Sequence, residues 1–327
     1  MKIIEDLYWY PKFEPVSHIL GRGLGGNVFV LNQGDQIWLF DVGLSIINRS
    51  NYVKKSMEKD GLDPQKISKI FLTHAHPDHI NAISDFKDGG GPDIYLHHDD
   101  LDLFEMDRHE WLKDQVRRIE KYWSVKSITK IFSRLITFFT WWTMGKYPAL
   151  DRDAVSHPWH KDQTIKGDRY NVQLIHTPGH TAGHAVYYIP EIKAVVSGDT
   201  INPRFANKPA LNTFNAFSDK YEKTIGLIQN LDLEILCAAH GEKIPTGKEH
   251  IQRIVSDAQN YLSNAKKIVY EKIENSGNEG LPIRKLRNIL PSDAWTGVDQ
   301  KITPLVIAME FIEKRTIYVQ NNRLFFP

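Results

Sequence analysis

One short stretch constrains the fold of this chain more than any other: residues 70–80, Ile-Phe-Leu-Thr-His-Ala-His-Pro-Asp-His-Ile. Its apolar start predicts a buried strand, and four potential metal ligands follow within six residues: His74, His76, Asp78 and His79. Side chains two apart in an extended segment point the same way, so the first two histidines can reach one point. Pro77 suits the first turn of a helix that carries the other two ligands to a second point. The alternative is a charged surface turn with unrelated histidines, which the recurrence of similar residues downstream disfavours.

Three more potential ligands, each beside a glycine, stand at the ends of later predicted strands: His180, Asp199 and His240. Glycine lets the backbone approach a site closely. Imidazoles and carboxylates without thiolates fit zinc, and also iron or manganese. The whole set is enough for two metal ions. Asp41, at the end of another strand, is either a turn former or a hydrogen-bonding partner of a metal-binding histidine.

Composition narrows the class of protein. A chain of 327 residues has room for one large domain plus a small one. The net charge of +1 disfavours electrostatic binding of nucleic acid or an anionic membrane by the chain as a whole. Cys237 is the only cysteine, which excludes an intrachain disulfide and favours a reducing compartment. The N-terminus has no apolar signal core, and no apolar stretch approaches the roughly 20 residues of a membrane span, so we expect a cytoplasmic protein.

Hydrophobic periodicity predicts a mixed α/β chain. Strands are expected at 27–31, 36–40, 70–72, 93–98, 171–175, 185–189, 194–196 and 235–238, and helices at 49–60, 218–231 and 247–275. His97 and His98 end one short strand and are expected to be solvated, while the region of His157 and His160 is expected to be a loop.

Two further segments stand apart from this pattern. Residues 100–150 are rich in aromatics, and residues 131–144 have helical spacing but are too short to span a bilayer. This insertion could be a lid over an apolar pocket, a dimer contact or extra core. The C-terminal end predicts helices near 282–289 and 302–314, then a hairpin that turns on Asn321-Asn322, an order that resembles a winged helix.

Several motifs together resemble the metallo-β-lactamase superfamily, in order and spacing, over roughly residues 1–245: Asp41-Val-Gly43, Thr73–His79, Thr177–His184, Ser197–Thr200 and Ala239–Gly241. The resemblance implies an αββα sandwich with its site along one edge. It implies two metal ions, zinc first with iron or manganese as alternatives. The first ion would be held by His74, His76 and His180, the second by Asp78, His79 and His240, and Asp199 would bridge them. Asp78 would also be the catalytic residue that orients the nucleophile, with Asp41 and His184 supporting the site by hydrogen bonds.

Within that superfamily the sequence looks most similar to glyoxalase II-like and lactonase-like enzymes. We therefore expect a hydrolase that uses a metal-bridging hydroxide to cleave a carbonyl ester, thioester or lactone in a small-molecule substrate. One alternative is a nuclease or phosphodiesterase, suggested by basic residues near the C-terminus: Arg284, Lys285, Arg287, Lys314, Arg315 and Arg323. Nearby acidic residues offset them, so nucleic acid is not the expected partner. Another is a persulfide dioxygenase with one iron.

The expected organisation is a catalytic domain over residues 1–245, with the helical insertion at about 100–150. A long helix and a winged-helix-like module over residues 246–327 follow it. An apolar substrate tail and a homodimer are both compatible with the aromatic insertion.

Overall fold

The computed structural model describes residues 1–11, 26–43, 49–87, 91–122, 150–203, 207–211, 213–286, 289–290 and 299–327. The aromatic segment 131–144 lies outside these residues, and with it the choice between lid, dimer contact and core packing. Within the described chain, no helix is both long and apolar enough to cross a membrane.

A mixed sheet forms the first half of the molecule. Among the described residues it has seven strands in the order β1-β2-β3-β4-β5-β6-β7. Their bounds are β1 Lys2–Ile4, β2 Leu7–Tyr10, β3 Val28–Asn32, β4 Ile37–Phe40, β5 Ile67–Phe71, β6 Asp93–His97 and β7 His157–Trp159. The four strands from β4 to β7 pair in parallel, so their carboxyl ends meet at one edge of the sheet.

A second sheet packs face to face on the first. Within the described chain it has five strands in the order β12-β11-β10-β9-β8. Their bounds are β8 Gln163–Ile165, β9 Val172–His176, β10 Ala185–Ile189, β11 Ala194–Gly198 and β12 Ile235–Ala238. β11 and β12 are parallel, so this sheet also places two strand ends side by side. An aromatic and aliphatic cluster that includes Phe71 and Tyr187 fills the space between the sheets.

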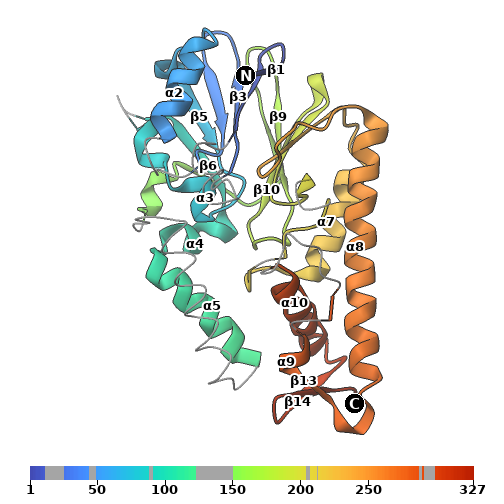
Figure 1. Ribbon diagram of the computed structural model, residues 1–327. Helices are drawn as coiled ribbons and strands as arrows, with labels where there is room; N and C mark the ends of the chain where they lie inside the picture. Colours follow the sequence, from blue (N-terminus) through green and yellow to red (C-terminus); the bar gives the residue numbers. More distant parts are fainter. Residues whose placement is uncertain are drawn as a thin grey trace.

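Helices cover both outer faces and complete an αββα sandwich (Figure 1). On the first sheet an apolar cluster joins the strands to α2 (Arg49–Lys59), α3 (Pro77–Ile80) and α4 (Leu101–Glu105). On the second sheet another cluster joins the strands to α7 (Ser218–Gln229) and α8 (Lys248–Glu274). α5 (Arg108–Tyr122) extends from the first half toward the C-terminal end of the molecule. Short 3₁₀ helices connect these elements at Pro64–Lys66, Ile83–Phe86, His98–Asp100, Arg152–Ala154, Pro190–Ile192 and Gly277–Glu279.

The C-terminal region follows directly from α8. It contains β13 (Leu281–Pro282), α9 (Ile283–Leu286), α10 (Asp299–Glu313), β14 (Tyr318–Gln320) and β15 (Arg323–Phe325), with the three strands in the order β13-β15-β14. Its apolar side chains belong to the same cluster as α7 and α8, so it shares a core with the outer face of the second sheet. The hairpin turns on Asn321 and Asn322, both at positive φ, as a tight two-residue turn requires.

The strands predicted between residues 27 and 238 are present, as are the long helix and the final hairpin. The loop expected around His157 and His160 is wrong in part, because residues 157–159 form β7. Pro158 hides this strand in the sequence, yet proline is tolerated there since β7 lies at the edge of its sheet. His97, expected to be solvated, is only 2% exposed, whereas His98 is exposed.

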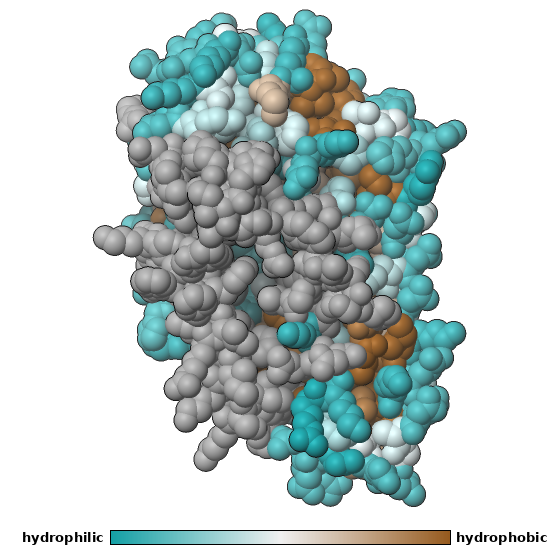
Figure 2. All heavy atoms as spheres, in the orientation of Figure 1, coloured by the Kyte–Doolittle hydropathy of each residue, from teal (hydrophilic) through white to brown (hydrophobic). Residues whose placement is uncertain are grey.

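The apolar residues gathered in these clusters leave a mainly hydrophilic surface. Figure 2 shows that the described part of one face is mostly hydrophilic, with hydrophobic residues confined to small separate patches. The strand ends that meet at one edge of the sandwich are therefore the feature of the fold that bears most on function.

Candidate metal centre

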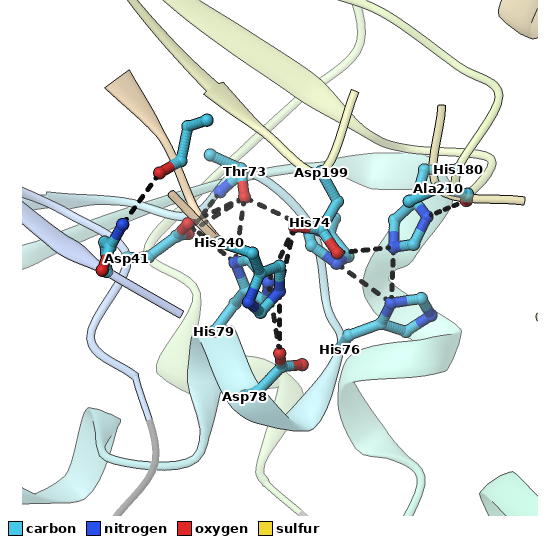
Figure 3. A network of polar contacts seen from close by, with 12 residues as sticks. Asp41, Thr73, His74, His76, Asp78, His79, His180, Asp199, Ala210 and His240 are labelled. Carbon is cyan, nitrogen blue, oxygen red and sulfur yellow. Dashed lines mark hydrogen bonds and ion pairs between the residues drawn. The ribbon is translucent and has the colours of Figure 1, made fainter. Parts of the chain in front are cut away.

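The structure brings all seven predicted ligand side chains together at this edge (Figure 3). They come from strand ends and one short helix: His74 and His76 follow β5, Asp78 and His79 lie in α3, His180 lies between β9 and β10, Asp199 follows β11, and His240 follows β12. Five of them are buried, and Asp78 and His240 are half-buried. The set is thus sheltered from water but open on the side of the last two.

His74, His76 and His180 form a first group. His76 Nδ1 lies 3.0 Å from His74 Nε2 and 2.8 Å from His180 Nε2. The rings stand edge to face, at 81° and 86°, so their in-plane lone pairs converge. His76 Nδ1 carries either one proton or one lone pair, so it cannot make good hydrogen bonds to both neighbouring nitrogens. A cation at the point between the three nitrogens could accept a lone pair from each of them. Ligand atoms around a tetrahedral zinc are roughly 3.3 Å apart, close to these spacings.

Asp78, His79 and His240 form a second group. His240 Nε2 lies 3.2 Å from Asp78 Oδ2, and His79 Nε2 lies 3.7 Å from the same oxygen. Two imidazole nitrogens and one carboxylate oxygen again point to a common position, and all three atoms lie within 4.8 Å of one another.

Asp199 lies between the two groups. Its Oδ2 is 3.4 Å from His180 Nε2 of the first group, and its Oδ1 is 3.1 Å from His240 Nε2 of the second. Asp199 Oδ1 and His79 Nε2 are buried, and neither has a partner with hydrogen-bond geometry among the described residues. Buried polar atoms are rarely left this way, and a bound cation would satisfy both. The residues therefore fit a pair of metal ions.

In two of the ligand histidines, a hydrogen bond on the side of the ring away from the site determines which nitrogen faces the site. His79 Nδ1 donates to Asp41 Oδ2 at 2.8 Å, and His180 Nδ1 donates to the carbonyl oxygen of Ala210 at 2.7 Å. A carbonyl or carboxylate oxygen can only accept here, so in each neutral ring the Nε2 atom keeps its lone pair for the site.

The pKa values of the histidines are shifted in opposite directions in the two ligand groups. Burial lowers the pKa of His74, His76 and His180, so these rings are neutral and ready to bind a cation. Burial opposes the charge on His79 too, but the carboxylates of Asp41, Asp78 and Asp199 outweigh it and raise the pKa of His79 to about 9. A cation in the second group would displace that proton.

Three buried polar residues hold the ligand loops. Asp41, at a φ of 55°, accepts from the backbone N–H of Thr73 at 2.8 Å as well as from His79. His184 accepts from the backbone N–H of Asp199 at 3.2 Å and lies 3.0 Å from the hydroxyl of Thr177. Asn27 donates to the carbonyl oxygens on either side of His240, those of Ala238 and Gly241, at 3.0 Å each.

The sequence did not predict that Asn27 would position a ligand loop through hydrogen bonds. Asp100 was also missed, although it is buried and accepts hydrogen bonds from two ligand loops. The indication was available: Asp100 comes shortly after the strand at 93–97, and parallel neighbouring strands end at the same edge.

His97, Asp99 and His176 form another cluster of potential ligands near the carboxyl ends of β6 and β9. The two imidazole rings are stacked 3.8 Å apart and only 8° from parallel. Their in-plane lone pairs therefore run side by side and do not converge. This cluster lacks the geometry that distinguishes the first two groups.

Comparison with known proteins gives the same family as the motifs. A family model described as the metallo-beta-lactamase superfamily matches residues 21–240. The probable metallo-hydrolase YqgX of Bacillus subtilis (strain 168) is 26% identical over 181 residues, which are 54% of this chain and 65% of that protein. The chain thus spans less than two thirds of that relative's length. A hydroxyacylglutathione hydrolase of Brucella anthropi is 50% identical over only 46 residues, 12% of this chain and 18% of that enzyme.

Solved structures share the fold. The metallo-beta-lactamase family protein TTHA1429 of Thermus thermophilus has a TM-score of 0.67 at 16% identity, over 100% of both chains. A beta-lactamase domain protein of Burkholderia ambifaria has a TM-score of 0.68 at 11% identity, over 100% of this chain and 94% of that one. At such identities the likeness concerns the fold alone. The family model, which covers most of the chain, shows that this protein belongs to the metallo-β-lactamase superfamily.

Proposed function

We propose that the chain is a hydrolase with two divalent metal ions, and that it cleaves a carbonyl ester, thioester or lactone. The observation that carries the proposal is the position of Asp199, whose two oxygens face two separate ligand groups. A carboxylate in this position would serve both ions at once. The first ion would be held by His74, His76 and His180, and the second by Asp78, His79 and His240.

The donor set favours zinc. Imidazole nitrogens suit zinc, iron, copper and nickel, while the two carboxylates also allow manganese. Bound there, the ions would lower the pKa of a water molecule toward neutrality and polarise the carbonyl oxygen under attack. No thiolate belongs to either of the two ligand groups among the described residues, because Cys237 is buried within β12.

Asp78 is the residue we assign to proton transfer. Its side chain is 24% exposed, against 7% for Asp199, so it borders the open side of the site. Burial opposes ionisation, but His79 and His240 hold the pKa of Asp78 well below its ordinary value. Asp78 would therefore be an ionised acceptor that orients the attacking water and receives its proton.

The names of two relatives bear on the substrate class. The relatives carry the names metallo-hydrolase and hydroxyacylglutathione hydrolase, but the match to the second covers 46 residues. The proposed ions and Asp78 would together serve the transfer of an acyl group to water. An apolar substrate tail and a homodimer, both expected from the aromatic segment 131–144, depend on residues that the structure does not describe.

A nuclease is the second candidate, and the C-terminal region bears on it. We propose that residues 246–327 form a winged-helix-like module, because β13, α9, α10 and the β14–β15 hairpin follow one another in that order. In such modules the helix before the hairpin commonly enters the DNA groove. Here residues 302–309 of α10 are all buried, so that helix is not free to bind a groove. This favours a small-molecule substrate.

Activity against a substrate panel tests the proposal. Zinc, iron and manganese forms would be assayed with thioesters, lactones, phosphodiesters and RNA, together with a persulfide for the one-iron dioxygenase alternative. We expect turnover of at least one ester, thioester or lactone, lost in Asp78→Asn. Cleavage of RNA or phosphodiesters alone would favour the nuclease, and oxygen consumption with a persulfide would favour the dioxygenase.

A further inference from the structure

Asp100 is a buried carboxylate outside the proposed ligand set. It ends the short helix His98–Asp100, which follows β6, and its side chain lies beside the end of β5. The residue is 1% exposed, and no lysine or arginine pairs with it in the part of the chain that the structure describes. An unpaired buried carboxylate is costly unless several hydrogen-bond donors surround it.

Three donors surround Asp100, and they come from two loops. Its Oδ2 accepts from the backbone N–H of Ala75 at 3.0 Å and from the hydroxyl of Thr181 at 2.7 Å. Its Oδ1 accepts from the backbone N–H of Gly183 at 2.7 Å. Ala75 lies between two residues of the first ligand group, His74 and His76, and Thr181 directly follows the third, His180.

We infer that Asp100 is a positioning residue that sets the distance between the two loops of the first ligand group; this inference rests on the proposed metal centre. One loop leaves the first sheet after β5, and the other joins β9 to β10 of the second sheet. A single carboxylate therefore ties the loops of the two sheets together through their backbones. The 2.8 Å between His76 Nδ1 and His180 Nε2 depends on that tie.

The glycine at position 183 leaves the space that the Asp100 side chain occupies. A Cβ atom at position 183 would lie 2.6 Å from the backbone nitrogen of Asp100 and 2.9 Å from its Cγ. Only glycine leaves room for the approach. Each oxygen is used, so an asparagine of the same shape would present an amide N–H to another N–H on one side. Burial raises the pKa of Asp100, and the three donors oppose that rise.

Asp100→Asn tests the inference, with Asp99→Asn as the matched control. Asp99 is the neighbouring residue, loses the same charge, and has a side chain that is 51% exposed. Metal-free protein of each variant would be titrated with Co²⁺ and followed by visible absorption, which reports both affinity and ligand geometry. The unfolding temperature of the metal-free protein would be measured in parallel, to separate a positioning effect from general destabilisation.

We expect Asp100→Asn to weaken Co²⁺ binding by roughly 10- to 100-fold and to alter the absorption bands. Asp99→Asn should stay within about twofold of the wild type, as exposed substitutions do. Unchanged affinity and bands in folded Asp100→Asn would overturn the inference. Absence of Co²⁺ binding by the wild-type protein would instead contradict the proposed metal centre itself.

A milder variant covers the case in which Asp100→Asn does not fold. Thr181→Val removes one donor and keeps the carboxylate, so its expected loss of affinity is about fivefold, the effect of one hydrogen bond. Thr213→Val is the control and should leave the affinity unchanged, because it removes a buried hydroxyl that has no hydrogen-bond partner in the part of the chain that the structure describes. Equal affinities in the two variants would overturn the inference.

Discussion

Replacing Asp41 by asparagine, which has the same shape, should move the proton of one proposed ligand, His79, from Nδ1 to Nε2. Asp41 Oδ1 accepts from the backbone N–H of Thr73 at 2.8 Å. Its Oδ2 accepts from the Thr73 hydroxyl at 2.9 Å and from His79 Nδ1 at 2.8 Å. Asparagine can keep its oxygen toward the Thr73 N–H, but its amide NH₂ then faces His79. The ring must accept at Nδ1, which places its proton on Nε2, the atom that faces the second group.

The magnitude follows from the bond that is lost. A hydrogen bond to a charged group contributes about 1.5–3 kcal/mol, which corresponds to roughly 10- to 150-fold in an equilibrium constant. To bind a metal, the variant must give up its new amide–imidazole bond or leave the ion without His79. We therefore expect the second ion to bind roughly 10- to 150-fold more weakly. The first ion should be affected less, because the ligand that Asp41 holds directly, His79, belongs to the second group.

Competition with a chromogenic chelator would measure the two zinc affinities in turn. Asp35→Asn is the control, since Asp35 is an exposed turn residue that undergoes the same chemical change. Two unchanged affinities in Asp41→Asn would refute the reasoning, because they would mean that His79 does not bind a metal through Nε2.

Three other changes have defined outcomes. Asn27→Ala removes two hydrogen bonds that flank His240, so chelator competition should find the second zinc weakened by roughly tenfold and the first unchanged. Removing the metals with EDTA should lower the melting temperature, because ligand at about 100 times its Kd stabilises the fold by roughly 2.7 kcal/mol; an unchanged calorimetric melt would contradict this. Burial opposes ionisation of Glu310, but contacts with Lys314, Ser218 and Lys266 lower its pKa below the ordinary value of 4.5. The contribution of the ionised Glu310 to folding stability is therefore fully present above pH 4.5 and is lost as the pH falls through the lowered pKa. Glu310→Gln should therefore cost about 1 kcal/mol in urea unfolding at pH 7 and less at pH 4; an equal cost at both would count against an ionised Glu310.

The parts of the site that are local in sequence could be predicted from it. His74, His76, Asp78 and His79 lie within one strand end and one helical turn, so backbone geometry alone places them together. The strand ends before His180, Asp199 and His240 could also be predicted from short apolar runs and from the glycine beside each of these ligands. The parallel pairing of β11 with β12 then brings the ends before Asp199 and His240 to one edge of their sheet.

The holding residues could not be predicted in the same way. Asp100 lies 25 positions from Ala75 and 83 from Gly183, and Asn27 lies 211 from Ala238. The place of Asp100 after a strand indicates the edge at which it lies, but the local sequence does not indicate the partners of either residue. Strand β7 was missed because proline contradicts the usual strand composition, while its edge position makes the missing donor harmless. Contacts that depend on two distant segments need the fold itself.

Metal stoichiometry in wild-type protein and in Asp199→Ala tests whether the site holds two metal ions. We expect elemental analysis to find two tightly bound ions per wild-type chain, because two ligand groups face the two oxygens of Asp199. Asp199→Ala should bind both ions more weakly and lose hydrolytic turnover while remaining folded. A single tightly bound ion in the wild type, or an Asp199→Ala protein that still holds two with unchanged affinity, would contradict the two-metal account.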